Sequence, residues 1–167
     1  MKIRVTKKLL NISRIKEVKD TSPLSENLPG EWYASLVSLN APGKHAIHFL
    51  HYPSLISIII LGKSINNVLP SLPDRISSLL DRHGYSDLIP SFEIHSKFEI
   101  FATNSKSILA YMNDMKNNIE YHLSKVTPLE LIEDIEYRNL FGGKLANNDY
   151  VTPEEILSKF RSKMVNC

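Results

Sequence analysis

Two short segments alternate apolar and polar residues with a period of two, which predicts β-strands. Residues 1–5 contain the run KIRV, in which two basic side chains alternate with two β-branched ones. In residues 92–102 the apolar side chains share one parity, and charged or histidine side chains take the other. We therefore expect each segment to form a strand with one buried face.

A hairpin and a third strand are predicted in the first half of the chain. Residues 32–39 and 45–51 are rich in β-forming residues and are separated by NAPG at 40–43, which is strong turn chemistry. Residues 55–61 form the run LISIIIL, whose apolar positions do not alternate. Such a run is typical of a strand that is covered on both faces. We expect it to be the central strand.

A different period, near 3.6 residues, predicts helices. One helix should begin near Ser71 and end at Gly84. The clearest helix covers residues 105–123, where one face carries a stripe of buried residues. Asn113 and Asp114 fall on the opposite face, where we expect them to be solvated. The stripe is Ile108, Met112, Met115, Ile119 and Leu123.

The C-terminal part of the chain shows two helix starts of the same kind. The sequences TPLE at 127–130 and TPEE at 152–155 each match a capping box, with Thr at the cap and Glu three residues later. The second start introduces an amphipathic helix over 153–165 that includes Phe160. Residues 139–149 are polar and carry two glycines, which predicts a loop.

Together these elements predict one α+β domain with a small, mainly antiparallel sheet of four to five strands. Two or three helices should pack on this sheet, and the C-terminus should be helical. We expect an α+β core over 1–125 and a helical extension over 126–167. The length of 167 residues and the 43% hydrophobic content suit a single globular domain.

Composition adds expectations about location. The single cysteine, Cys167, allows no disulfide within the chain, which is typical of a reducing compartment. The first residues, MKIRVTKKLL, lack the apolar core of a signal peptide. The longest apolar run is too short to cross a bilayer. We expect a cytoplasmic protein that has no membrane association.

Several segments, in order, resemble a bacterial family known only as a domain of unknown function. They are MKIRVTKKLL, EWYASLVSLN, LHYPSLISIIILG and TNSKSILAYMNDM followed by NIEYHL, and they cover residues 1–125. The resemblance implies a shared fold and a bacterial or mobile-element origin. It transfers no catalytic residue, because no activity is assigned to the family.

The three evenly spaced histidines, His45, His48 and His51, invite comparison with a metal site. On the predicted strand His45 and His51 share a face about 20 Å apart, and His48 points the other way. Zinc requires convergent ligands, so we expect no metal there. We expect a polar, partly exposed strand face instead, which is available for partner contact if the strand lies at an edge.

A basic patch at the N-terminus suggests contact with nucleic acid, although it lacks interleaved aromatic residues for base stacking. The formal charge of residues 1–20 is 7 − 2 = +5, against +2 for the whole chain. A solvated surface is the preferred interpretation. The candidate contacts are Lys2, Arg4, Lys7 and Lys8.

No familiar catalytic or cofactor motif is found, so we expect no cofactor. The leading hypothesis is a non-catalytic interaction protein of a bacterial or phage accessory system, such as a toxin–antitoxin or defence pair. It would bind a protein partner or a second copy of itself. The alternatives are a nucleic-acid-associated protein and an enzyme with a non-motif site near Tyr33 and the histidine strand. The candidate partner contacts are His45, His48, His51, Asn113, Asp114 and Phe160.

Overall fold

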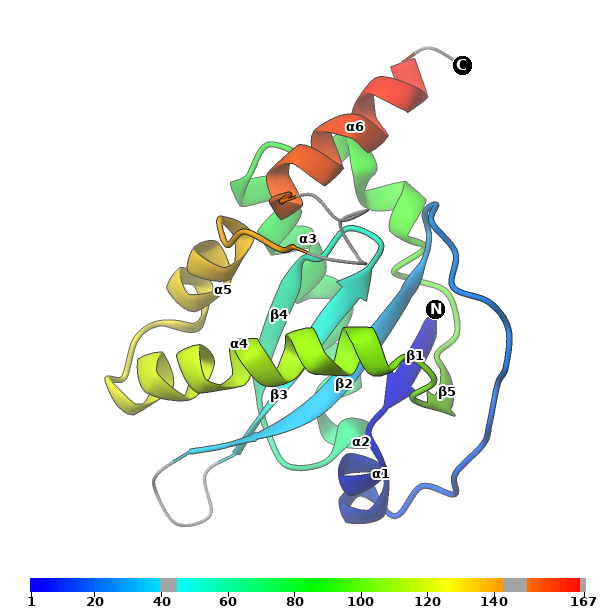
Figure 1. Cartoon of the computed structure of the whole chain (residues 1–167), viewed down its shortest axis with the longest axis vertical. Coiled ribbons are helices and arrows are strands. Elements are labelled where there is room, and N and C mark those ends of the chain that lie inside the picture. The colour runs from blue at the N-terminus through cyan, green and yellow to red at the C-terminus, as the bar shows by residue number, and fades with distance from the viewer. Residues whose placement is uncertain (40–44, 143–149, 166–167) are drawn as a thin grey trace.

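The computed structural model describes residues 1–39, 45–142 and 150–165, and it contains a five-stranded sheet (Figure 1). The order across the sheet is β4-β3-β2-β1-β5. Strand β1 pairs in parallel with β2 and β5, whereas β2, β3 and β4 form an antiparallel meander. The α+β class is therefore confirmed, and the sheet is mixed. The strands are β1 (Lys2–Val5), β2 (Glu31–Ser38), β3 (His45–Tyr52), β4 (Ser57–Leu61) and β5 (Glu99–Ala102).

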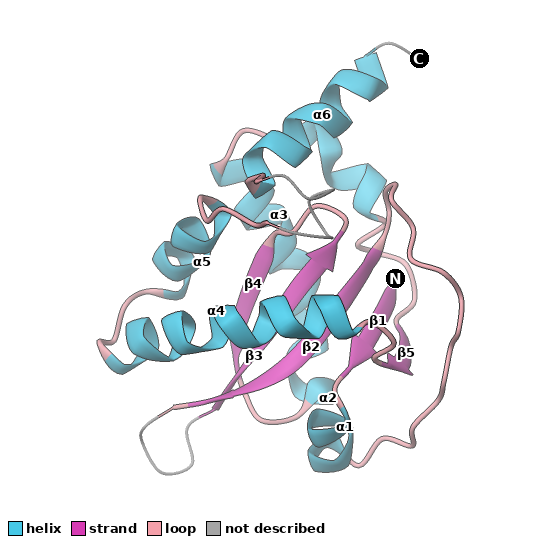
Figure 2. Ribbon diagram, viewed as in Figure 1, coloured by secondary structure: helices cyan, strands magenta, loops and turns pink. Residues whose placement is uncertain are grey.

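Helices cover both faces of the sheet (Figure 2). Side chains from α1, α2 and α3 share one core cluster with one face, and α4 and α5 contribute to the cluster on the other. The helices are α1 (Lys7–Ser13), α2 (Ile65–Val68), α3 (Leu72–Arg82), α4 (Lys106–Ser124), α5 (Leu129–Tyr137) and α6 (Pro153–Val165). Two 3₁₀ segments, η1 (Leu69–Ser71) and η2 (Ser86–Phe92), flank α3.

Helix α4 follows the predicted pattern closely. Met112 and Met115 are buried against the sheet, and Asn113 and Asp114 are exposed on the opposite side. The Ser105 side chain caps the helix by accepting a hydrogen bond from the Ile108 amide at 3.3 Å. This long helix therefore owes its orientation to a local apolar stripe that the sequence shows directly.

The prediction that residues 55–61 form the central strand is wrong, because β4 lies at the edge of the sheet. Its continuous burial has another cause. Helix α5 packs along the open side of β4, and the buried Glu133 carboxylate accepts a hydrogen bond from the Ile59 amide at 3.0 Å. A helix thus covers the edge that would otherwise be free to pair with another chain.

Two other expectations about strands are corrected. Strand β3 is paired on both sides, so its histidines lie inside the sheet rather than at an edge. In the predicted strand over 92–102 only Glu99–Ala102 is extended, because the chain first forms η2 and a turn. The predicted turn at 40–43, residues 143–149 of the predicted loop, and Cys167 lie outside the described residues.

Helix α6 begins with the predicted capping box. The Thr152 amide donates to the Glu155 carboxylate at 2.8 Å, and the Glu155 amide donates to the Thr152 hydroxyl at 3.2 Å. The helix docks on its own domain through the buried Leu157. The equivalent capping box at Thr127 is not formed, because α5 begins one residue later than predicted, with Pro128 as an N-cap that makes no side-chain hydrogen bond.

Candidate functional site

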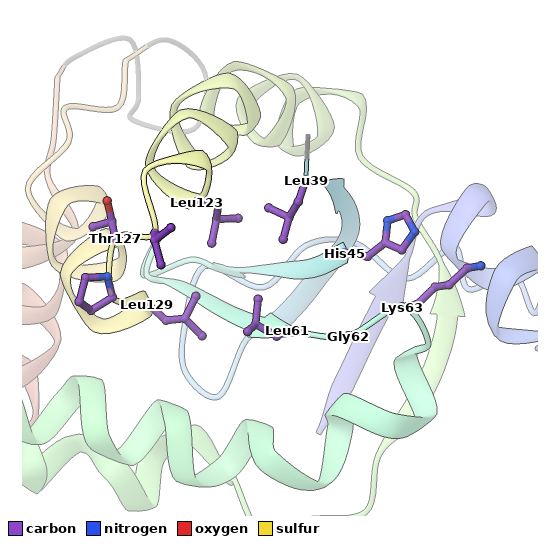
Figure 3. A pocket seen from close by; sticks show the side chains of 10 residues that line it. Leu39, His45, Leu61, Gly62, Lys63, Leu123, Thr127 and Leu129 are labelled. Carbon is purple, nitrogen blue, oxygen red and sulfur yellow. The ribbon is translucent and has the colours of Figure 1, made fainter. Parts of the chain in front are cut away.

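A cavity of about 660 Å³ opens at one end of the sheet, beside the turn between α4 and α5 (Figure 3). Its walls come from the ends of β2, β3 and β4 and from the α4–α5 turn. Small-molecule sites have volumes of roughly 300–1,000 Å³ and mostly apolar walls. We call this space the α4–α5 cavity. It is lined by Leu39, His45, Leu61, Gly62, Lys63, Leu123, Val126, Thr127, Pro128 and Leu129.

Strand pairing forms one wall of the cavity. Leu61 ends β4 opposite Ala46 of β3, and the Gly62 amide donates to the His45 carbonyl at 2.9 Å. This hydrogen bond continues the ladder beyond the strand and holds His45 beside Gly62 and Lys63. The ends of β3 and β4 therefore bring one titratable and one cationic side chain to the same rim.

The end of α4 forms the opposite wall through a Schellman motif. The Thr127 amide donates to the His122 carbonyl at 3.2 Å, and the Val126 amide donates to the Leu123 carbonyl at 3.1 Å. The motif reverses the chain, so that Leu123 before the turn and Leu129 after it both line the cavity.

Val126 occupies an unfavourable position in this turn. Its φ is 58°, in the left-handed region where glycine is the usual residue of a Schellman motif. A β-branched residue in that region is an outlier that costs roughly 1–3 kcal/mol. Its side chain is also 88% exposed, at the edge of the cavity. Strain of this kind concentrates at binding sites, so Val126 marks this turn as a candidate functional surface.

The polar side chains of the cavity are sparse and under-used. The Nδ1 atom of His45 is shielded from solvent and has no hydrogen-bond partner within the described residues. The Thr127 side chain does not cap α5. Lys63 is exposed and forms no ion pair with the described part of the chain. A buried polar atom ordinarily has a partner, and Nδ1 departs from this rule on the inner side of the ring, which leaves Nε2 as the ring nitrogen that can face the cavity.

The other two histidines of β3 are structural. His48 and His51 are fully buried, which lowers the pKa of His48 to about 3 and that of His51 to about 4. The His48 Nε2 lies 3.0 Å from the Ser57 hydroxyl. The His51 Nε2 donates to the Pro29 carbonyl at 2.8 Å, so its Nδ1 accepts from the Ser54 hydroxyl at 2.7 Å. The prediction of a partly exposed histidine face is therefore wrong for His48 and His51, and only His45 is half-buried.

The remaining candidate partner contacts are dispersed. Asn113 and Asp114 are exposed on the outer face of α4. Phe160 of α6 is half-buried and packs on the core cluster that contains Leu157. The structure does not bring these side chains to the α4–α5 cavity. Of all the predicted partner contacts, only His45 lines it.

The basic residues at the N-terminus divide into two groups. Arg4 is fully buried and pairs with Glu31 at 2.7 Å and Asp20 at 3.0 Å. Lys2 also pairs with Asp20, and this hydrogen bond holds the pKa of the Asp20 carboxyl well below its ordinary value. Lys7 and Lys8, in contrast, are exposed on α1.

Tyr33, the residue proposed for a non-motif enzyme site, belongs to the same internal polar cluster as Arg4 and Glu31. Its hydroxyl lies 2.7 Å from Asn104 Oδ1 and 3.1 Å from a Glu31 carboxylate oxygen, two acceptors that share its single proton. Burial and the nearby carboxylate raise the pKa of Tyr33 far above its ordinary value. The hydroxyl is therefore a neutral structural donor at physiological pH.

Within the described ranges 1–39, 45–142 and 150–165, no helix is long and apolar enough to cross a membrane. No group of three or more histidine, cysteine or acidic side chains is arranged to hold a metal ion within the same ranges.

Sequence reasoning missed most of the cavity. Its walls combine four separate stretches of sequence, and only Leu123 had been assigned to an apolar stripe. A retrospective signal exists at Val126, where the end of a long predicted helix lacks the usual glycine. A single sequence does not show that the turn at this position adopts a left-handed conformation.

The fold and the cavity define an α+β protein whose mixed sheet carries a ligand-sized apolar cavity at one end. The chain belongs to the family described as Domain of unknown function (DUF6933), whose model matches residues 2–156. The expected family of unknown function is thereby confirmed, and the match continues past residue 125 through α5 into α6. No curated protein and no solved structure matches the chain.

Proposed function

We propose that this protein is a non-catalytic binding protein and that the α4–α5 cavity is its binding site. The observation that carries the proposal is an open cavity of about 660 Å³ beside a strained, exposed Val126. Burial of an apolar group against the leucines of the lining would release about 25 cal/mol for each Å² removed from water.

The proposal ranks binding above catalysis because of where the titratable side chains lie. His48 and His51 have no exposed surface through which to contact a substrate. At the cavity the titratable groups are His45 and Lys63, and none of the ten lining residues is acidic. A binding role needs only the apolar walls and a few orienting polar groups.

We propose that the protein acts in the cytoplasm, as part of a bacterial or phage accessory system of toxin–antitoxin or defence type. The sequence resemblance described above supports it. Identification of the neighbouring genes tests this setting, since a co-transcribed toxic partner would support it and a housekeeping operon would count against it.

The direct test of binding uses N-phenyl-1-naphthylamine, a neutral dye that fluoresces in apolar sites. We expect saturable binding to the full chain and a loss of at least tenfold in affinity for Leu61→Asp, because a charge would enter the apolar wall. Leu61 is 58% exposed, so this variant should fold.

The matched control is Leu140→Asp. Leu140 is 68% exposed and lies beyond the other end of α5, outside the lining. We expect this variant to bind the dye like the natural chain. Equal binding by both variants and the natural chain would refute the cavity as the site.

A second candidate function is contact with a polyanion such as nucleic acid. The observation that favours it is a group of exposed cations in and after α1 that form no ion pair within the described residues, namely Lys7, Lys8, Arg14, Lys16 and Lys19. Binding should weaken steeply with salt, and Lys7→Glu with Lys8→Glu should reduce the salt slope. Salt-independent binding would exclude this electrostatic mode.

A further inference from the structure

Polar and apolar side chains are separated along the α4–α5 cavity. Figure 3 shows His45 and Lys63 together at one end, Leu39 and Leu61 in the middle, and Leu123 and Leu129 toward the α4–α5 turn. A ligand that filled this space would therefore meet a polar, cationic end and an apolar body.

The polar end carries positive charge without a compensating acid. Lys63 is exposed, and no carboxylate is among the residues of the lining. Helix α1 lies close to this end, because the Ser13 hydroxyl accepts a hydrogen bond from the Ile65 amide at 2.9 Å. The exposed Arg14 follows Ser13 directly.

His45 supplies a second polar group at the same end. Its Nδ1 is removed from solvent and has no partner within the described residues. Because Nδ1 is shielded, an anionic oxygen in the cavity would approach the other ring nitrogen, accept a hydrogen bond from Nε2–H and face Lys63 at the same time. Hydrogen bonds to charged groups are roughly twice as strong as neutral ones.

We infer that the ligand of the α4–α5 cavity is an amphipathic carboxylate, a hydrophobic chain or ring system that ends in one acidic group. The carboxylate lies between His45 and Lys63, and the apolar body covers the leucines. This inference rests on the proposed binding function and adds the chemical class of the ligand. Charge complementarity selects a carboxylate over a neutral molecule of the same length.

The test compares octanoate with 1-octanol by isothermal titration calorimetry on the full chain. We expect octanoate to bind about tenfold more tightly or better, since a charge-assisted hydrogen bond is made only by the acid. Lys63→Met should reduce octanoate affinity by about tenfold and leave 1-octanol affinity unchanged. Because Lys63 is exposed, its replacement should not disturb folding.

The matched control is Lys106→Met, which removes another exposed cation at the far end of α4. We expect this variant to keep the preference for octanoate. If octanoate and 1-octanol bind equally, or if Lys63→Met and Lys106→Met behave alike, the carboxylate inference is overturned and the binding function stands. If neither compound binds the natural chain, both fail.

Discussion

The carboxylate of Glu133 accepts a hydrogen bond from the backbone amide of Ile59 at 3.0 Å. This contact joins the middle of α5 to the open edge of β4 and takes the place of a further strand. Glu133 is fully buried and also pairs with Arg75 at 2.6 Å and Arg82 at 3.2 Å. Burial raises the pKa of its carboxyl, so the two arginines are needed to hold the ionised form.

The first prediction concerns this contact. Glu133→Ala should lower the free energy of unfolding by about 3 kcal/mol, because it leaves the buried Ile59 amide without its acceptor and removes the one buried carboxylate that Arg75 and Arg82 share. Glu133→Gln retains an acceptor for the amide and should lose less. Urea denaturation measures both.

The control for this prediction is Glu130→Gln. Glu130 also pairs with Arg75, but its side chain is 48% exposed. Its replacement should change stability by no more than about 0.5 kcal/mol. Equal losses for Glu130→Gln and Glu133→Ala would show that the edge contact adds nothing.

The second prediction concerns pH. Burial lowers the pKa of His48 to about 3 and that of His51 to about 4, from an ordinary value of 6.5. Below pH 6.5 the unfolded chain therefore binds more protons than the folded chain, and stability is lost as the pH falls. We expect a loss of about 1.4 kcal/mol per pH unit for each histidine once it is protonated in the unfolded state.

Buried carboxyls act in the opposite direction. Burial raises the pKa of Glu133 and Glu136, so the folded chain binds protons first and these groups favour folding as the pH falls. The histidine contribution is isolated by comparing the natural chain with His51→Gln from pH 7.5 to 4.5. The variant should show a shallower loss of stability; identical pH profiles would contradict a buried neutral His51.

The third prediction tests the orientation of α4. Met112→Asp should lower the free energy of unfolding by about 4 kcal/mol or more, because Met112 is only 2% exposed and the new carboxylate would be buried without a partner. Asp114→Ala should leave the melting temperature nearly unchanged, since Asp114 is exposed. Similar melting temperatures for the two variants would mean that the helix is rotated from the position described.

The fourth prediction concerns the strained turn at the cavity. Val126→Gly should raise stability by about 0.5 to 1 kcal/mol, because glycine adopts a left-handed conformation without steric penalty. The same change should weaken binding of an apolar ligand. Lys125→Gly, at a φ of −88°, is the control and should give no gain. A Val126→Gly protein less stable than the natural chain would remove the argument from strain.

Local patterns in the sequence predicted much of the fold. The apolar stripe of α4 and the pairing of β2 with β3 follow from residues near one another in the chain. The position of β4 could not be predicted in this way, because its burial at the edge depends on Glu133, 74 residues away. The parallel position of β1 between β2 and β5 likewise depends on long-range pairing.

The candidate site was largely beyond sequence reasoning for a similar reason. Leu61 and Leu129 belong to different elements and have no common periodicity, and they meet only because α5 packs beside β4. His45 was recognised as a candidate contact, but its two neighbours on the same strand are buried. Even spacing along β3 therefore carried no functional meaning.

The central claim is that the α4–α5 cavity binds an apolar ligand, and methyl NMR of the leucines tests it most directly. On titration with 1-octanol, the methyl signals of Leu39, Leu61, Leu123 and Leu129 should shift and saturate together. The signal of the exposed Leu140 should stay in place. Shifts that do not saturate, or that affect Leu140 as much as the leucines of the lining, would contradict the account.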